Sequence, residues 1–423
     1  MPYPDLVDHR TGIVRSLRAE RVPVQFPAGF DLVTATLSDT TRFAPWAADP
    51  AGAGYALNDP AAVLGAALGE AVERYCGNAV PEGLAHGSAR SLRAAGRRVL
   101  DLGALALFSA EQYAEPGFPA APLDDDLEIE WASSVDGTLV PASLVWPSYP
   151  GSRRGFPLTN PVVQAGLAAG RTRADALTSA VREIVERDAM TLAWYGERGF
   201  TRVREPRWLR DLSRGPGGDL ETRYVVLPQE FRIPVLAALV RDRVTGYLSL
   251  GTGVADDPVD AALKAFGEAL QLQLVLRDHD DPETALGRVG GTPGSPLKAW
   301  RADRRYGQSY RPDRRDAIDY ACHLQLHLDP AVQGEFEERF AASIDGVVDL
   351  SDLRADADPV RAVLDQGFDL LEVDLTTPDV RALGLHVLRV VVPGTYSNSA
   401  VGLPFLGGTR LDVRRTTRVP LPH

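Results

Sequence analysis

Apolar and polar residues alternate along several short segments of the chain, which is the pattern of strands buried on one face. We expect strands within residues 12–26 and 32–37, where the alternation is clear. Residues 127–145 alternate on both sides of Asp136-Gly137, and Asp-Gly between alternating runs is a strong hairpin signal. Further strands are expected at 224–227, 235–240, 246–251, 369–375 and 386–392, and irregular structure at 208–219.

Three longer segments carry apolar residues at helical spacing, and each follows its own start signal. Asp59-Pro60 and Asp257-Pro258 place an N-cap before a proline at the first helical position. Thr172 and Asp175 have the spacing of a capping box. The order strand, glycine-containing loop, acidic helix occurs twice. The pattern therefore predicts an α/β (α+β) fold, with helices packed on mixed sheets and two related halves around a shared cleft.

Each of these helices repeats one spacing of acidic residues. Two carboxylates three residues apart share one helix face and repel each other, so a single pair is most simply a solvated surface. A solvated surface gives no reason for three separate helices to repeat the pattern, whereas a site where the helices converge does. Carboxylate oxygens suit Mg²⁺ and guanidinium groups suit phosphate. The three sets are Glu70, Glu73 and Arg74; Glu183, Glu186 and Arg187; and Glu268 with Gln271.

These motifs also resemble those of the YcaO family. The resemblance rests on the two ExxER segments, on the run 160–170 before the second helix, and on Glu268 with Gln271. It covers roughly residues 55–423, so 56–423 is interpreted as one YcaO domain and the strands of 1–55 as part of the same unit. The resemblance implies a YcaO-like fold with an ATP cleft, and ATP and Mg²⁺ as cofactors.

The resemblance also assigns roles to individual residues. Ala66 stands where the pattern of the second helix has Ser179, and Gln273 stands where an arginine often follows the third motif. The expected Mg²⁺ ligands are Glu70, Glu73, Glu183 and Glu186, with Glu268 adding to the acidic wall. The expected nucleotide contacts are Arg74, Arg187, Ser179, Asn160, Arg15 and Ser16, the last two with a turn as the simpler interpretation. The expected catalytic residues are Glu183, Glu186, Gln271, Pro422 and His423.

The end of the chain, 418–423, is a proline-containing extended tail that can lie in a groove. Azoline-forming YcaO enzymes end in a PxPxP tail near the active site. Here Arg418 replaces the first proline and His423 is an additional residue. The incomplete tail keeps the reaction subtype open.

By resemblance, the chain is a cyclodehydratase acting on a precursor peptide. A Cys, Ser or Thr side chain attacks the preceding amide, ATP phosphorylates the resulting oxyanion, and loss of phosphate leaves a thiazoline or oxazoline. One alternative is a YcaO enzyme that forms a thioamide or macroamidine. Another is a catalytically inactive scaffold of a biosynthetic complex. A separate E1-like, leader-peptide-binding partner is expected to present the peptide, and a homodimer is compatible with this role.

Composition excludes several other classes. The net charge of −12 disfavours nucleic acid and anionic membranes as partners. Cys76 and Cys322 cannot form a disulfide framework, and no signal peptide or membrane-spanning run is evident, so a cytoplasmic location is expected. Residues 283–316 are rich in Gly, Pro and Arg, which predicts a mobile surface segment, either a peptide-binding lid or a disordered insertion. His323 and His327 are expected to pack rather than bind zinc.

Overall fold

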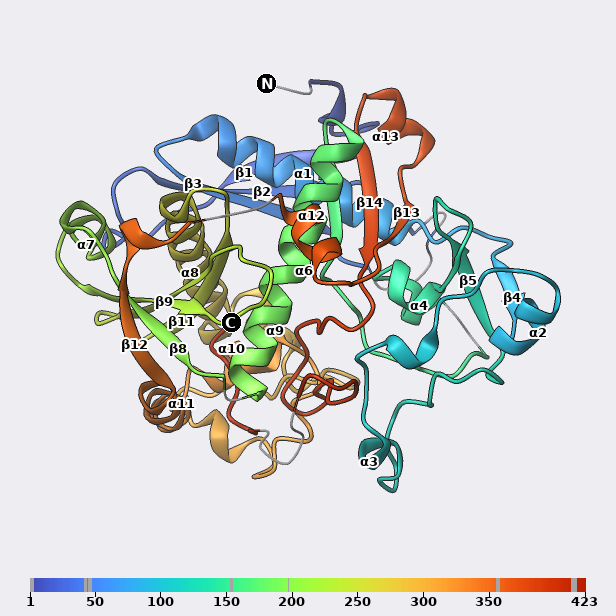
Figure 1. Cartoon of the computed structure of the whole chain (residues 1–423). Coiled ribbons are helices and arrows are strands. Elements are labelled where there is room, and N and C mark those ends of the chain that lie inside the picture. Colours follow the sequence, from blue (N-terminus) through green and yellow to red (C-terminus); the bar gives the residue numbers. More distant parts are fainter. Residues whose placement is uncertain are drawn as a thin grey trace.

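The structure is a computed structural model of the chain (Figure 1). It describes residues 4–41, 44, 48–152, 155–196, 198–354, 358–411 and 417–423. Three long helices each lie against a sheet. No helix among the described residues is both long and apolar enough to cross a membrane.

The first sheet is antiparallel, in the order β1-β2-β3, and α1 packs on β3. Glycines in β3 allow the helix to approach its backbone, because a Cβ on Gly54 would lie only 2.2 Å from the carbonyl oxygen of Val63. The expected strand at 22–26 is wrong: these residues form a loop, and Val24 is 92% exposed. The bounds are β1 (Val14–Ala19), β2 (Phe30–Leu37), β3 (Ala51–Leu57) and α1 (Pro60–Asn78).

The largest sheet has the order β11-β10-β9-β8-β12, antiparallel except for the parallel pair of β12 and β8. Helix α8 packs on β11 and β10, and Gly253 repeats the close approach seen in β3, with its Cβ position 2.3 Å from the carbonyl oxygen of Ala261. Residues 208–219 were expected to be irregular, but they contain most of α7 (Arg207–Ser213). The bounds are β8 (Phe200–Arg204), β9 (Leu220–Leu227), β10 (Val235–Asp242), β11 (Leu248–Val254), β12 (Ile344–Asp349) and α8 (Pro258–Asp280).

The third sheet, β13-β14-β7, is antiparallel and carries the long helix α6 (Arg173–Tyr195). Figure 1 shows α6 running through the middle of the molecule, between this sheet and the largest one. Its buried residues join those of both sheets in one hydrophobic cluster that includes Ile184, Leu239 and Val390. The central helix is therefore held on both sides. The strands are β7 (Leu167–Gly170), β13 (Leu371–Asp374) and β14 (His386–Val391).

The predicted hairpin around Asp136-Gly137 is present in the fourth sheet, β4-β5-β6. Gly137 has φ of +85°, a conformation that favours glycine. The strands are β4 (Ala85–Gly87), β5 (Ile129–Ser133) and β6 (Leu139–Pro141). The shorter helices are α2 (Ala89–Ala94), α3 (Ala110–Tyr113), α4 (Ala142–Val145), α5 (Tyr149–Ser152), α9 (Ala285–Val289), α10 (Ala321–Leu326), α11 (Pro330–Ala342), α12 (Pro359–Asp365) and α13 (Pro378–Ala382), with 3-10 turns at Pro4–Leu6, Leu102–Ala104, Tyr306–Gln308 and Leu350–Asp352.

Most residues of the segment 283–316 are exposed or half-buried, as expected of a surface segment, but two of its aromatic rings are not. Tyr306 and Tyr310 are fully or almost fully buried and belong to a hydrophobic cluster beside α8. Arg304 is paired with Asp280 near the end of that helix. The tyrosines are therefore core residues, and the compositional signal was misleading because glycine, proline and arginine do not reveal which aromatic rings are buried.

Candidate functional site

The first glutamate of each acidic helix occupies the same place in its helix, ten residues after the first helical residue (Pro60 to Glu70, Arg173 to Glu183, Pro258 to Glu268). Each accepts a hydrogen bond from a backbone N–H of the segment that packs under the helix. The carboxylates are thereby fixed in orientation by the sheets. The three pairs are Ala53 N to Glu70 Oε2 at 2.7 Å, Gly166 N to Glu183 Oε2 at 2.9 Å, and Thr252 N to Glu268 Oε2.

The second glutamate of the first two helices reaches across to another element. Glu73 of α1 accepts from the N–H of Ala169 in β7 at 2.8 Å. Glu186 of α6 accepts from the Thr252 hydroxyl in β11 at 2.7 Å. The same hydroxyl oxygen lies 3.1 Å from Glu268. Glu186 and Glu268 are therefore linked through one hydroxyl, and the charge of Glu183 raises the pKa of Glu73, which places the carboxylates of α1 beside those of α6; we call these residues the carboxylate set.

Arg187 is the guanidinium inside this set. Its Nη2 lies 3.4 Å from Glu268 Oε1 and 3.5 Å from Glu186 Oε1, and its Nη1 contacts the His423 ring. Glu186, Glu268 and Glu183 raise the pKa of Arg187 against the opposing effect of burial. Arg74 occupies the other end of the set.

Arg74 bonds mainly to acidic groups. Its guanidinium lies 2.9 Å from Glu70 and 3.3 Å from Asp49, and Nη1 donates to Gln164. Because Asp49 is half exposed, this end of the set is closer to solvent than the end around Arg187.

Burial raises the pKa of three of the carboxylates, Glu73, Glu183 and Glu186. It raises the pKa of Glu73 to about 8, against the lowering effect of the Ala169 hydrogen bond, and Glu70 and Glu183 add to the increase. Burial removes the water that stabilises the charged carboxylates, and the lowering effect of Arg74 and Arg187 does not fully offset this. A divalent cation would supply further positive charge, and these hard oxygen donors suit Mg²⁺.

The carboxylates do not meet at one point in this arrangement. No three or more acidic, histidine or cysteine side chains of the described residues form a ready-made ion site. Each carboxylate still has lone pairs beyond those used by its N–H or O–H donor. Mg²⁺ keeps several waters and takes one or two carboxylates together with phosphate oxygens, so a preformed cage is not required.

A pocket of about 560 Å³ lies between the first halves of α1 and α8. Its lining includes Tyr55, Ala66, Arg182 and Lys264. Burial raises the pKa of Tyr55, and Glu268, Glu186 and Glu70 raise it further, which places this ring against the carboxylate set. Tyr55 was not predicted from the sequence, because nothing around it on the chain distinguishes it from other strand tyrosines.

The tail lies along the free edge of β11. The N–H of Leu250 donates to the carbonyl of Pro422 at 2.6 Å, and Nδ1 of His423 lies 2.9 Å from the Leu250 carbonyl oxygen. The His423 ring thereby stands next to Arg187. Burial lowers the pKa of His423 to about 3, and Arg187 lowers it too, so the ring is neutral near pH 7.

Arg389 in β14 is a second residue that sequence reasoning missed. It is fully buried and donates to four backbone carbonyl oxygens, and burial lowers its pKa to about 10. Three of these carbonyls belong to the loop that ends at Gly166, the N–H donor of Glu183. Arg389 thus shapes the loop that orients a carboxylate. Its acceptors are Val145, Val163, Gln164 and Ala165.

Other predicted residues have no contact with the carboxylate set within the described part of the chain. Asn160 is fully buried. Its amide oxygen accepts from the hydroxyls of Ser143 and Thr159, and its amide nitrogen donates to the carbonyl oxygens of Ser143 and Pro161. Both amide hydrogens are used, so Asn160 has no donor left for a nucleotide.

The remaining predicted side chains lie around the set without a bond to it. Ser179 is exposed, one turn before Glu183, and Gln271 is half-buried, one turn after Glu268. Arg15 and Ser16 are exposed in β1, which β2 separates from β3. The nucleotide roles of these four residues stay predictions.

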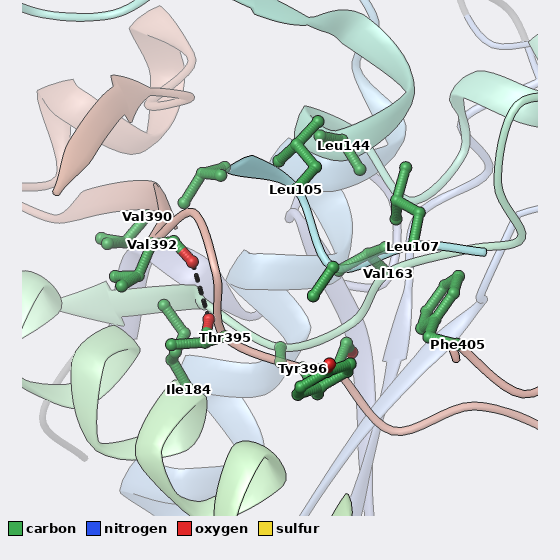
Figure 2. A pocket seen from close by; sticks show the side chains of 14 residues that line it. Leu105, Leu107, Leu144, Val163, Ile184, Val390, Val392, Thr395, Tyr396 and Phe405 are labelled. Atoms are coloured by element: carbon green, nitrogen blue, oxygen red, sulfur yellow. Dashed lines mark hydrogen bonds between the residues drawn. The ribbon is translucent and has the colours of Figure 1, made fainter. Parts of the chain in front are cut away.

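A separate apolar cavity of about 60 Å³ lies beside α6, and Figure 2 shows its lining. Ile184, Val390, Leu144 and Phe405 point into it, and Thr395 bonds back to the Val392 carbonyl. No carboxylate, histidine, lysine or arginine lines this cavity. The cavity therefore offers no side chain that would hold a cation or a phosphate, in contrast to the carboxylate set.

Residues 53–396 match the model of the YcaO family, described as a YcaO cyclodehydratase that binds ATP and Mg²⁺. A protein from Rhizobium leguminosarum bv. trifolii, known as an uncharacterized protein in the tfuA 3′ region, is 29% identical over 255 residues. That match covers 54% of this chain and 56% of the relative, so the chain spans about half the length of the relative it matches.

Three solved structures share the fold at low sequence identity. A heterocyclase in complex with substrate and cofactor has a TM-score of 0.66 at 21% identity, covering 100% of this chain and 56% of the heterocyclase. YcaO from Methanopyrus kandleri, bound with AMPPCP and Mg²⁺, has a TM-score of 0.59 at 18% identity, covering 95% of this chain and 88% of the Methanopyrus chain. The E. coli microcin synthetase McbBCD complex has a TM-score of 0.58 at 13% identity, covering 96% of this chain and 96% of the matched chain.

Proposed function

Because the chain belongs to the YcaO family, whose members are described as ATP- and Mg²⁺-binding cyclodehydratases, we propose that it is an ATP-dependent enzyme acting on a backbone amide of a precursor peptide. The proposed products are thiazoline or oxazoline rings formed from Cys, Ser or Thr. The observation that carries the proposal is the set of glutamates that three helices bring together, among which burial raises the pKa of Glu73, Glu183 and Glu186.

In the proposed enzyme, the carboxylates of Glu70, Glu73, Glu183 and Glu186 hold Mg²⁺, while Arg187 and Arg74 face the phosphates. ATP, when bound, supplies the phosphoryl group that turns the amide oxygen into a leaving group. The protein's own contribution is position and charge, as is usual for phosphoryl transfer. The backbone N–H donors of the carboxylates fix them before the nucleotide arrives, so little reorganisation is needed.

Tyr55 and the pocket between α1 and α8 are the proposed place of the nucleotide. The pocket borders the carboxylates through Tyr55, and Arg182 and Lys264 stand on its walls. Ala66 lines it at the position that Ser179 has in α6, so this wall lacks a hydroxyl. The peptide substrate and a separate protein that presents it are part of the proposal, because one solved heterocyclase of this fold is in complex with its substrate and the E. coli microcin synthetase of this fold is a complex.

Calorimetry with Mg²⁺ and ATP tests the proposal, comparing wild type with Glu183→Gln/Glu186→Gln. We expect wild type to bind and the double variant to lose binding by at least about tenfold, which is 1.4 kcal/mol. The matched control is Glu335→Gln/Glu338→Gln, two exposed glutamates of α11 that should bind like wild type. No binding by folded wild type, alone and with a candidate partner, would support the scaffold alternative.

Intact-mass measurement of a candidate precursor peptide then separates the reactions. Loss of one water per modified residue is expected for azoline formation. Replacement of oxygen by sulfur would instead show a thioamide. A macroamidine also loses water, but only an azoline consumes the side chain of a Cys, Ser or Thr, so blocking these side chains distinguishes the two.

A further inference from the structure

Strands β8 and β9 pair only briefly, and a groove opens where they separate. Their register contains only the pairs Thr201 with Val226 and Arg202 with Val225. Beyond Arg202 the two strands part, although β8 continues to Arg204 and β9 begins as far back as Leu220. A pocket of about 590 Å³ lies between the separated parts of the two strands; we call it the groove. Figure 1 shows α7, which connects the two strands, at the periphery of the molecule beside this end of the sheet.

The groove collects positive charge on a chain whose net charge is −12. Five arginines and two glutamates line it: Arg202, Arg204, Arg210, Arg214, Arg243, Glu205 and Glu221. None of them belongs to the carboxylate set. The concentration of guanidinium groups in one concave place favours an anionic occupant, because each guanidinium can bind a carboxylate through two parallel hydrogen bonds.

Three of the five arginines already have an acidic neighbour, and two do not. Arg204 pairs with Asp349 at 2.8 Å, Arg210 with Glu205 at 2.8 Å, and Arg243 with Glu221 at 2.7 Å. Arg202 and Arg214 have no ion pair with any described residue. Exposed ion pairs stabilise a protein little, so the paired arginines can still share donors with a ligand.

The shape of the groove favours an extended chain. A strand that has lost its neighbour presents unpaired N–H and C=O groups, which are a template for another strand. Here β9 lacks its β8 partner from Leu220 to Tyr224; the N–H of Leu220 donates to the Arg214 carbonyl at 3.1 Å, so the edge left without a strand partner lies beyond Leu220. Nucleic acid is the less favourable anion, because the chain as a whole repels a long polyanion.

We propose that this groove binds an acidic, extended segment of the peptide substrate, which lies along β9 and places its carboxylates on Arg202 and Arg214. The identity of the occupant as the substrate rests on the proposed function, whereas binding of an acidic peptide does not require ATP. The segment would be recognised outside the residues being modified, and would tether the substrate to the enzyme.

Fluorescence anisotropy tests the groove with short labelled peptides and the full chain in low salt. A peptide of alternating Glu and Thr should bind, and Arg202→Gln/Arg214→Gln should weaken binding by at least about tenfold. The control is Arg97→Gln/Arg207→Gln, two exposed arginines outside the groove, one of them on α7 itself. Both variants replace exposed side chains, so thermal melting should match wild type.

Four outcomes would overturn the proposal. The first is equal binding of the Lys-Thr counterpart, and the second is equal binding of the Glu-Thr peptide by both double variants. The third is equal binding of an alternating Glu-Pro peptide, because proline cannot donate to a strand ladder. The fourth is displacement of the Glu-Thr peptide by single-stranded DNA at a lower concentration than unlabelled peptide requires. Calorimetry of Arg202→Gln/Arg214→Gln with Mg²⁺ and ATP should match wild type, so failure of the groove and failure of the proposed function are distinguishable.

Discussion

Glu73 is a carboxylate whose protonation near neutral pH is decided by burial. Its pKa of about 8 in the folded protein lies above its ordinary value of 4.5, so between these values the folded state binds more protons than the unfolded state. The stability this contributes is fully present below about pH 4.5 and is lost as pH rises through 8. A neutral side chain at this position would remove that dependence.

We therefore predict that Glu73→Gln without Mg²⁺ is more stable than wild type at pH 7, by up to about 3 kcal/mol, because the neutral amide takes up no proton on folding. Its stability should decline less than that of wild type between pH 5 and 8. Mg²⁺ affinity should fall at least about tenfold, the loss that even a supporting group of a metal site causes. Urea denaturation across pH and Mg²⁺ calorimetry measure the two effects. Unchanged Mg²⁺ affinity would remove Glu73 from the ion site.

Arg389 allows a prediction about positioning. Arg389→Met would leave four buried carbonyl groups without their donor, and each unsatisfied buried group costs roughly 1–3 kcal/mol before water enters. We expect a loss of several kcal/mol in the free energy of unfolding.

The matched control for Arg389 is Arg361→Met, whose side chain is 73% exposed in an i,i+4 ion pair and should change stability by less than about 0.5 kcal/mol. Chemical denaturation compares the two. If Arg389→Met remains folded, its Mg²⁺ affinity should also fall, because the loop that presents Gly166 to Glu183 is no longer held. An equally small effect in both variants would contradict the role assigned to Arg389.

Among the elements, α1 on β3 and α8 on β11 are built in the same way. Both helices begin with an aspartate N-cap and a proline, and both rest on a strand with the sequence Gly-x-Gly. In both strands the residue between the glycines donates its N–H to the first glutamate of the helix. The close helix–strand contact is therefore part of how the carboxylates are oriented.

Gly54→Ala should destabilise the protein by about 1–3 kcal/mol, the usual cost of overpacking, because the added Cβ would lie 2.2 Å from a backbone oxygen of α1. Gly253→Ala should behave alike in the other half, where the corresponding distance is 2.3 Å. Gly65→Ala is the control, since nothing lies within 4 Å of its Cβ position in α1. It should stabilise by roughly 0.5–1 kcal/mol through helix propensity. Thermal and urea unfolding give the sign of each change.

For the whole molecule, buried groups of both kinds shape the dependence of stability on pH. Burial lowers the pKa of His323 and His423 to about 3 and that of His327 to about 4. These values lie below 6.5, so the unfolded chain binds more protons, and stability is present above pH 6.5 and lost as pH falls through the folded values. His327 bonds to Pro420 in the tail, His323 accepts from Val401 in the loop beside it, and His423 belongs to the tail itself, which ties acid unfolding to that region.

We predict that the melting temperature without Mg²⁺ declines on both sides of about pH 6.5, through the histidines as pH falls and through Glu73 as pH rises to 8. Mg²⁺ should raise the melting temperature more at pH 8 than at pH 6, because protons compete with it for the carboxylates. At an Mg²⁺ concentration of about 100 times its Kd the stabilisation is roughly 2.7 kcal/mol. Differential scanning fluorimetry with Mg²⁺ or EDTA measures this, and an equal increase at both pH values would contradict proton competition.

By itself the sequence determined the three acidic helices, their caps, the hairpin at Asp136-Gly137, and the glutamates that the helices carry. These features depend on residues three or four apart, or on the residues next to a turn, so a local pattern is sufficient to predict them.

Only the tertiary structure decided which groups the glutamates meet. The N–H of Ala169 for Glu73, the ring of His423 for Arg187, and the carbonyls around Arg389 come from segments far away in the chain. The tertiary structure also decided which residues are buried. Burial raises the pKa of Glu73, and it places Tyr306 and Tyr310 in the interior. The desolvation of a group depends on all the atoms packed around it, so it cannot be predicted from the spacing of residues along the chain.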